Sequence, residues 1–414
     1  MKKLISLTIA ALISFSMISC ASNAKQDTKK PAAPEKTVRV FNSEVAIKDN
    51  GSKPIKDMTG LEIVYDMKTG WNLGNSLDAT GGGMNSETSW GQPRTTKAMI
   101  DGLARSGMKT IRIPVSWHNH IIDSNYTIDP NWMARVKEIV DWAMEDDMYV
   151  ILNTHHDNFS RNSKMPYRYG YYPTEENYEE SVSFLTNTWK QIALAFNNGY
   201  DEHLIFETLN EPRCCGTGYE WNYSSGNAEQ KKAQMILNQF NQEIVNVIRA
   251  SGGNNAKRLI TVPGYACTPA APLSADFVLP DDPANNLGVA VHMYSPYNFA
   301  MDGNGTSKYN PKMASDLQYT FKQLEAKFVK KGIPVYIGEY GAVNKDNLED
   351  RVQWFNTFVR QTRKLGITCI LWDNQAVEKD SNGWSEKFGY YNRNEQKWFF
   401  PEITETIMNA ADLK

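Results

Sequence analysis

The sequence has few cysteines, little net charge and only one long apolar run. Five cysteines in 414 residues are too few for a disulfide-stapled fold, and a chain of this length can bury enough apolar surface without disulfides or a metal. The 44 basic and 47 acidic residues leave a net charge of −3, which argues against a nucleic-acid partner. With 41% hydrophobic and 22% charged residues, the chain is globular and not disordered.

The one long apolar run stands near the first residue. Lys2 and Lys3 precede residues 4–17, a run of signal-peptide length that is shorter than the about 20 residues needed to span a bilayer. The run ends in Met17-Ile18-Ser19-Cys20, which resembles a bacterial lipobox. We therefore expect lipidation of Cys20 and export as a membrane-anchored lipoprotein, facing the periplasm or the cell surface. A plain secretory signal is the alternative, because Met17 stands where Leu is usual.

The rest of the chain divides by composition. Residues 1–19 are the expected signal peptide, and residues 20–37, with no large apolar side chain after Cys20, are the lipidated cysteine and a flexible tether. In residues 38–57 the apolar side chains partly alternate before the turn signal Asn50-Gly51, which is consistent with a linker or short strands. No break in composition follows, so residues 58–414 are expected to form a single domain.

Short apolar runs alternate with helix-like segments throughout this domain. Amphipathic helices are expected at residues 96–106, 131–145, 181–196, 229–250, 313–331 and 348–365. Strands are expected at residues 68–72, 110–114, 149–153, 204–209, 259–263, 288–292, 335–338 and 368–372. Eight strands alternating with helices favour the α/β class and a (β/α)8 TIM barrel over an open sheet. A dinucleotide-binding GxGxxG motif after a strand is absent from the sequence.

Polar or aromatic side chains stand at or just after the ends of most of these strands. In a (β/α)8 barrel this edge carries the functional residues, because the carboxyl ends of all eight strands meet there. The candidates are Asn72, Asn75, Arg112, His155, His156, Asn210, Glu211, His292, Tyr294, Glu339 and Trp372.

Two of the candidates are carboxylates on opposite sides of the expected barrel mouth. Glu211 follows the fourth strand in Leu-Asn-Glu-Pro, and Glu339 follows the seventh in Ile-Gly-Glu-Tyr-Gly. Cleavage of a glycosidic bond needs such a pair, one carboxyl as proton donor and the other as nucleophile or stabiliser. Arg112 and Tyr294 are candidates to stabilise the ionised member. The acid member is expected to have a raised pKa, and Asn210 is a candidate to bind a substrate hydroxyl.

At these motifs the chain resembles glycoside hydrolase family five, the cellulase family. The resemblance runs in order from about residue 70 to 372 and is most like bacterial endoglucanases that often accept xyloglucan and mixed-linkage glucan. The blocks that carry it are Gly70-Trp71-Asn72-Leu73-Gly74-Asn75, Ile111-Arg112-Ile113-Pro114-Val115, Asn153-Thr154-His155-His156-Asp157, Asn210-Glu211-Pro212, His292-Met293-Tyr294, Gly338-Glu339-Tyr340-Gly341 and Leu371-Trp372-Asp373.

The resemblance implies a retaining endo-β-1,4-glucanase without a cofactor, with Glu211 as acid/base and Glu339 as nucleophile. It implies that Arg112, Asn210, His292 and Tyr294 surround the reacting bond. It also implies that the non-reducing-side sugars are bound by Asn75, Asp78, His155, His156 and the stacking platform Trp372. A β-glucan is the expected polysaccharide partner. Xyloglucan, glucomannan or mannan are alternative substrates, and a non-catalytic glycan-binding lipoprotein is the alternative of a different class.

Two further readings are less favoured by the sequence. A metal site at His155-His156-Asp157 is disfavoured, because adjacent side chains on a strand point to opposite faces and no HExxH motif is present. Adjacent Cys214 and Cys215 are expected as two free thiols, since a disulfide between neighbours closes a strained ring. We expect a monomer with no metal.

Overall fold

The structure, a computed structural model, describes residues 37–39, 46–48, 50–159, 168–378 and 386–412. The expected signal peptide, Cys20 and nearly all of the expected tether lie outside these residues. Two short antiparallel strands, β1 (Thr37–Arg39) and β2 (Ala46–Lys48), occupy the segment expected as linker or strands. Within the described residues, none of the helices combines the length and the apolar character that crossing a bilayer requires.

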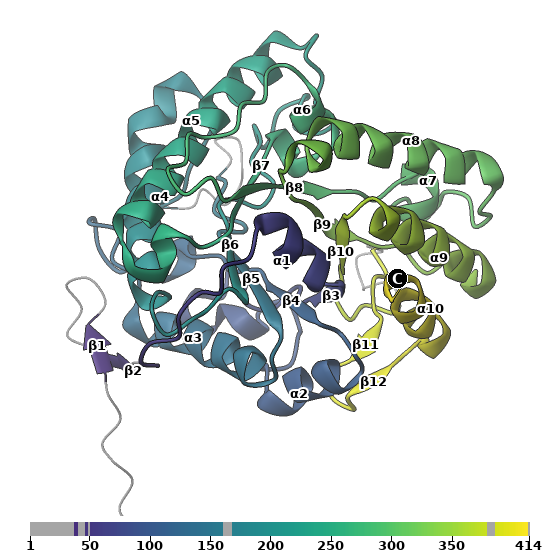
Figure 1. Cartoon of the computed structure of the whole chain (residues 1–414), viewed down its shortest axis with the longest axis horizontal. Helices are drawn as coiled ribbons and strands as arrows, with labels where there is room; N and C mark the ends of the chain where they lie inside the picture. Colours follow the sequence, from purple (N-terminus) through teal and green to yellow (C-terminus); the bar gives the residue numbers. More distant parts are fainter. Residues whose placement is uncertain (1–36, 40–45, 49, 160–167, 379–385, 413–414) are drawn as a thin grey trace, which may run out of the picture. The chain divides into compact units, whose positions relative to one another are not determined.

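Eight parallel strands close into a barrel, which confirms the predicted fold (Figure 1). The order around the barrel follows the sequence, with β10 closing against β3. Each strand lies within one to two residues of its predicted bounds. The strands are β3 (Thr69–Asn72), β4 (Thr110–Ile113), β5 (Tyr149–Asn153), β6 (Leu204–Glu207), β7 (Ile260–Pro263), β8 (Leu287–His292), β9 (Val335–Tyr340) and β10 (Thr368–Leu371).

Helices surround this barrel, and six of the longer ones were predicted: α2 (Lys97–Arg105), α3 (Pro130–Glu145), α4 (Tyr178–Ala195), α5 (Ala228–Ala250), α8 (Pro311–Lys327) and α9 (Leu348–Lys364). Helices α3 and α8 begin alike: Asp129 and Asn310 cap the first turn, and a proline takes the first helical position, where its missing N–H costs nothing. The elements that were not predicted are α1 (Gly60–Asp66), α6 (Ala270–Leu273), α7 (Tyr297–Ala300), α10 (Pro401–Ala411) and the hairpin β11 (Tyr391–Asn392) and β12 (Lys397–Trp398).

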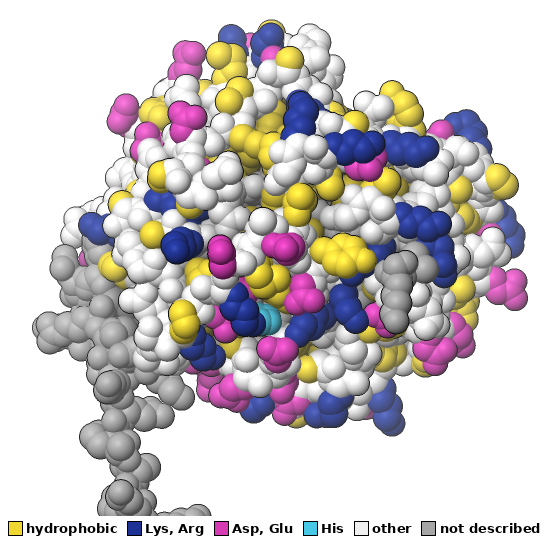
Figure 2. All heavy atoms as spheres, in the orientation of Figure 1, with side chains coloured by type: hydrophobic (Ala, Val, Ile, Leu, Met, Phe, Trp, Pro, Cys, Tyr) yellow, Lys and Arg dark blue, Asp and Glu magenta, His cyan; other side chains and the backbone are white. Residues whose placement is uncertain are grey.

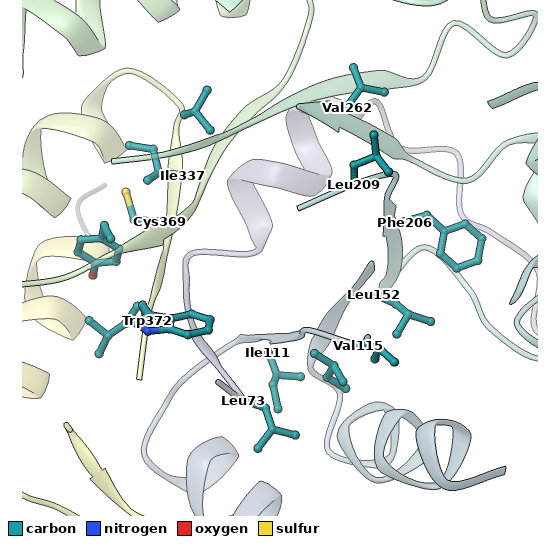
Figure 3. Close-up of a cluster of buried hydrophobic side chains, with 14 of the residues drawn as sticks. Leu73, Ile111, Val115, Leu152, Phe206, Leu209, Val262, Ile337, Cys369 and Trp372 are labelled. Atoms are coloured by element: carbon teal, nitrogen blue, oxygen red, sulfur yellow. The ribbon is translucent and has the colours of Figure 1, made fainter. Parts of the chain in front are cut away.

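Successive residues of each strand face opposite sides of the barrel wall. On β5, Val150 and Leu152 belong to the large cluster beneath the helices, whereas Tyr149 and Ile151 belong to a smaller cluster. Figure 3 shows Leu152 and Phe206 within the large cluster. The smaller cluster fills the barrel and also contains side chains of α1. The barrel interior is therefore a packed core and not a channel.

Helix α1 covers the amino-terminal end of the barrel, over the middle of the ring of strands (Figure 1). Thr59 and Glu62 form a capping box at its start. A Cβ on Gly60 would lie 2.8 Å from Pro334 Cγ, so only glycine allows the helix to sit this close to the strands. Figure 2 shows acidic and basic side chains interspersed over the same face.

Toward the opposite, carboxyl end of the strands the inward-facing residues become polar. They are Asn72, Arg112, Asn153, Glu207 and His292, and all are buried. A bulge in β9 brings Glu339 into this polar set. Val291 of β8 pairs with Ile337 of β9, but the next residue of β8, His292, pairs with Glu339. Gly338 is thus the extra residue, and the bulge turns Glu339 inward although Ile337 faces outward. The sequence placed Glu339 after this strand; the structure places it inside.

Candidate active site

Arg112 is the buried centre of the polar layer. Its Nη1 donates to Glu339 Oε1 at 2.7 Å and its Nη2 donates to Glu207 Oε1 at 2.6 Å. The same two nitrogens donate to Asn72 Oδ1 at 2.9 Å and Asn210 Oδ1 at 2.6 Å. Burial would lower the pKa of Arg112, but the charges of Glu207 and Glu339 raise it above its ordinary value. Arg112 is therefore a fixed positive charge with four acceptors.

Glu207 is a functional residue that the sequence reasoning missed. Its carboxylate accepts hydrogen bonds from Arg112, from Tyr336 Oη at 2.5 Å and from Asn153 Nδ2 at 2.9 Å. Burial would raise the pKa of Glu207, but the charge of Arg112 lowers it below its ordinary value. The signal was present, because a glutamate at the end of the apolar run Leu-Ile-Phe-Glu must find a cation when the strand is buried.

Glu339 is held from two sides. Tyr294 Oη donates to its Oε2 at 2.8 Å, while Arg112 donates to its Oε1. The contacts that the sequence analysis expected for Arg112 and Tyr294 are both present. The two donors fix the carboxylate plane and balance its charge, which suits a nucleophile that must attack from one direction.

Glu211 lies close enough to Glu339 to share one reacting bond. His292 Nδ1 donates to Glu211 Oε1 at 2.9 Å and lies 3.6 Å from Glu339 Oε2. One carboxylate oxygen of Glu211, one of Glu339 and a nitrogen of His292 all lie within 4.8 Å of one another. Retaining enzymes have carboxyl groups about 5–5.5 Å apart, whereas inverting enzymes need about 6.5–9.5 Å. The geometry therefore fits retention.

The pKa expected for the acid member is corrected by the structure. Burial raises the pKa of Glu211, but the hydrogen bond from His292 and the charges of His292 and Arg213 lower it below its ordinary value. Burial lowers the pKa of His292, but Cys267, Glu339 and Glu211 hold it well above its ordinary value. Glu211 and His292 therefore hold one proton between them, and titrate as a pair.

Trp372 and His155 form an aromatic surface beside Glu339. Their rings are parallel within 4° with centroids 6.0 Å apart, and His155 Nε2 lies 4.0 Å from Glu339 Oε1. A Cβ on Gly74 would lie 2.9 Å from the Trp372 indole, so glycine at this position lets the indole pack against the turn after β3. Burial holds the pKa of His155 well below its ordinary value, so the ring is neutral.

Asp78 is buried in the turn after β3, and the sugar-binding role expected for it stays a prediction. The side chain is fully buried, and its two oxygens accept the main-chain N–H groups of Asn75 and Ser76 at 3.0 and 2.7 Å. These bonds hold Asn75 in a left-handed conformation with φ of 59°. Burial raises the pKa of Asp78 to about 7. Asp78 thus shapes the turn that presents Asn75, which is partly exposed.

His156 and Trp90 lie at the same side of the mouth. His156 Nε2 is 4.0 Å from Asp78 Oδ2, and the His156 ring is 5.5 Å from the Trp90 ring. Trp90 is 40% exposed. The structure therefore brings Trp90, which the sequence analysis did not commit to the site, next to a committed site residue.

Two further residues that sequence reasoning missed hold the loops after β3 and β10 together. Trp71 Nε1 donates to Asp373 Oδ2 at 2.8 Å. Arg393 Nη2 donates to the carbonyl oxygens of Gly74 and Asp373, both at 2.8 Å. The partners are separated by some 20 to 320 positions, so no local sequence pattern could have paired them.

Three groups in the described residues bring potential metal-ligand atoms within 4.8 Å of one another: Asp78, His155 and His156; Asp201, Glu202 and His203; and Glu211, His292 and Glu339. In the third group, His292 Nδ1 is already engaged by Glu211. Cys214, Cys215, Cys267 and Cys369 are free thiols, as expected for the adjacent pair. Burial raises the pKa of Cys214 and of Cys215 to about 11, so both stay protonated.

Paired carboxylates at the carboxyl end of a (β/α)8 barrel, beside an aromatic surface, define a glycoside hydrolase. Comparisons agree: residues 77–378 match the model of the family described as cellulase (glycosyl hydrolase family 5). The chain belongs to this family. Endoglucanase B of Ruminococcus albus is 38% identical, over 100% of this chain and 98% of that protein. Endoglucanase 1 of the same organism is 42% identical, over 85% and 81%.

Solved structures give the same result. A family 5 lichenase from Caldicellulosiruptor sp. F32, in complex with cellotetraose, is 40% identical with a TM-score of 0.80 and covers 90% of this chain and 100% of its own. A broad-specificity endoglucanase from Ruminococcus champanellensis, with bound cellotriose, is 42% identical with a TM-score of 0.78 and covers 86% and 99%. The chain is a retaining endo-β-1,4-glucanase, and the family and fold predicted from the sequence are confirmed.

Proposed function

We propose that this endoglucanase cleaves cellulose-type and mixed-linkage β-glucans, with Glu339 as the nucleophile and Glu211 as the general acid/base. One arrangement of the two carboxylates carries the assignment. Glu339 is held by two donors, and Glu211 shares a proton with His292. Carboxylate oxygens of Glu339 and Glu211 lie less than 5 Å apart. The similar structures with cellotetraose and cellotriose support a β-1,4-linked glucan as substrate.

In the first step, Glu339 attacks the anomeric carbon and Glu211 protonates the departing glycosidic oxygen. Arg112 and Tyr294 hold the attacking carboxylate in line with the bond. The 2.9 Å contact between His292 Nδ1 and Glu211 Oε1 holds a proton within reach of Glu211, which passes it to the departing oxygen. The product of this step is an α-linked glycosyl ester on Glu339.

In the second step, Glu211 accepts a proton from water, and that water attacks the ester from the opposite face. The configuration at the anomeric carbon is inverted twice and hence retained. Arg112 compensates the charge that returns to Glu339. Asn210 Oδ1 accepts from Arg112, so the side chain offers its amide donor to a substrate hydroxyl beside the anomeric carbon.

The sugars on the non-reducing side are proposed to stack on Trp372 and to contact His155, His156 and Asn75. Trp372 supplies an apolar face, and the neutral histidines and the amide supply donors and acceptors for hydroxyls. Asp78 contributes indirectly, through the turn that carries Asn75.

The test incubates the purified protein and its Glu339→Gln variant with barley β-glucan, carboxymethyl cellulose, xyloglucan and glucomannan, with products sized by mass spectrometry. We expect short oligosaccharides from barley β-glucan and carboxymethyl cellulose with the wild type alone. Products from glucomannan or xyloglucan only would replace the proposed substrate. Polymer bound but left intact on every substrate would make the chain a glycan-binding protein.

We also propose that the protein is an exported lipoprotein anchored through Cys20. The support is the basic pair Lys2-Lys3, the apolar run of residues 4–17 and the lipobox-like Ile18-Ser19-Cys20. Expression of the full chain and of Cys20→Ser in a bacterium, with labelled fatty acid, tests this. Label and membrane sedimentation are expected for the wild type only, while a soluble, unlabelled wild type would indicate a plain secretory signal.

A further inference from the structure

Arg213 lies two residues beyond Glu211, in the loop that follows β6, and contacts both the main chain and the side chain of Glu211. Its Nη1 donates to the Glu211 carbonyl oxygen at 2.9 Å. The same Nη1 lies 3.9 Å from Glu211 Oε2. His292 holds the other carboxylate oxygen, Oε1. The two oxygens of the acid/base thus face two different cationic side chains.

The Arg213 side chain is itself fixed by two neighbours. Its Nε donates to Glu220 Oε1 at 2.9 Å, and its guanidinium carbon lies 3.9 Å from the centroid of the Trp221 ring. Glu220 Oε2 accepts from the main-chain N–H of Gly216 at 2.9 Å, so the glutamate is tied to the same loop. A guanidinium stacked on indole and paired with a carboxylate loses little further freedom when it binds a third group.

The loop behind this cluster is anchored to α5. Gln230 Nε2 donates to the carbonyl oxygens of Tyr219 at 2.8 Å and Trp221 at 3.1 Å. Trp221 is nevertheless 48% exposed. Its indole stacks on the Arg213 guanidinium and excludes water from that face, which lowers the local dielectric and strengthens the interaction between Arg213 and Glu211.

We propose that Arg213, held by Trp221 and Glu220, is a positioning residue that fixes the Glu211 carboxyl and tunes its ability to give and take a proton. The inference rests on the proposed role of Glu211 as acid/base. Arg213 is not itself expected to touch the reacting atoms.

The charges around Glu211 agree in sign with this assignment. Burial raises the pKa of Glu211, and His292, Arg213 and His156 lower it. Glu220 partly neutralises the charge of Arg213. Loss of Glu220 should therefore let Arg213 lower the pKa of Glu211 further, whereas loss of Arg213 should remove this lowering. The other titratable groups that face Glu211 stay the same in both variants; they are Glu339, Tyr294, Cys267, Tyr171 and Cys215.

The test measures kcat/KM against pH for hydrolysis of a soluble cello-oligosaccharide by the full chain. With Arg213→Met, the alkaline limb is expected to move up by about 1 pH unit, because a cation beside the carboxyl is lost. With Glu220→Gln it is expected to move down. Arg213→Lys keeps the charge and is expected to keep the wild-type limb. The control Arg360→Met, which removes a partly exposed arginine of α9 bonded to Asn356 of the same helix, is expected to keep it too.

A second substrate separates this role from a loss of folding. 2,4-Dinitrophenyl β-cellobioside has a leaving group that departs without a proton, so its kcat/KM should fall less in Arg213→Met than that of the oligosaccharide. Equal falls on both substrates, or alkaline limbs that coincide in the wild type, Arg213→Met and Glu220→Gln, would overturn the inference about Arg213 alone. Oligosaccharide hydrolysis that survives in Glu211→Gln would overturn the role of Glu211 and the inference with it.

Discussion

The hydroxyl of Tyr336 donates a 2.5 Å hydrogen bond to Oε2 of Glu207, a carboxylate whose other oxygen accepts from Arg112. Both residues face into the barrel and both are buried. Tyr336 therefore supports Glu339 through two intermediates: it orients Glu207, Glu207 holds Arg112, and Arg112 donates to Glu339. The chain of contacts crosses three strands, β9, β6 and β4.

Glu207→Gln is expected to weaken both stability and activity. Breaking a buried ion pair costs up to about 3–5 kcal/mol, and Arg112 would keep Glu339 as its remaining carboxylate partner. Tyr336→Phe removes the hydrogen bond to the charged Glu207 and a second one with Thr261, and should cost at least about 1.5–3 kcal/mol. Urea unfolding and kcat measure the two effects. Glu405→Gln, at an exposed position of α10, should change stability by less than about 0.5 kcal/mol. A Glu207→Gln enzyme as stable and active as this control would contradict the argument.

The two catalytic carboxylates are expected to differ in the product that azide traps. Glu211→Gln should lower kcat/KM on oligosaccharides about 10²–10⁴-fold, and Glu339→Gln at least as much, with the unfolding temperature nearly unchanged. With an activated aryl β-cellobioside, azide should give the β-glycosyl azide in Glu211→Ala and the α-glycosyl azide in Glu339→Ala. NMR of the products distinguishes the two, and the reverse pattern would exchange the assigned roles.

Trp372→Ala is expected to raise KM for cellotetraose about tenfold, with a smaller effect on kcat. An aromatic face is worth about 0.5–1.5 kcal/mol beyond the area it buries, and a factor of ten corresponds to about 1.4 kcal/mol. The KM of Trp372→Phe should lie between that of the wild type and that of Trp372→Ala. Trp142→Phe on α3, where the indole packs against Arg135, is the matched control. Unchanged KM in Trp372→Ala would remove the stacking role.

Burial of His120 should make the free energy of unfolding fall at acidic pH. Its ring stacks on Trp132 with centroids 3.6 Å apart, and burial lowers its pKa to about 3. The unfolded chain takes up this proton near pH 6.5 and the folded chain does not, so the contribution of His120 is constant above about pH 6.5 and falls between there and pH 3. In His120→Asn, the free energy of unfolding should depend on pH less steeply than in the wild type, by about 1.4 kcal/mol per pH unit between pH 4 and 6. Parallel slopes in urea unfolding at several pH values would contradict this.

The eight strands could be predicted because burial on both sides makes them apolar runs, and the helices between them carry a regular amphipathic pattern. The position of Glu339 at the mouth was predicted for the same reason. The bulge at Gly338 was not, since it depends on how β9 pairs with β8 and β10, and no local pattern encodes that register.

Around the two carboxylates, some contacts were predicted from the sequence and others were not. Arg112 and Tyr294 were predicted as candidates to stabilise the ionised carboxylate, and both donate to Glu339. For Asp78 the sequence predicted sugar binding, which stays a prediction, but it did not predict that the carboxylate accepts two main-chain N–H groups. Roles in binding and catalysis remain predictions.

The chain enters and leaves the barrel at the end that α1 closes. Lys53 O accepts from Asn254 and Lys56 pairs with Glu202, all near the amino ends of strands, and Lys68, just before β3, pairs with Asp412 at 2.8 Å. A solid support coupled through Lys53 or Lys56, or at the end of α10, would sit on the face away from Glu211 and Glu339. The enzyme could therefore be immobilised at this end of the barrel while a long polymer still threads across the mouth.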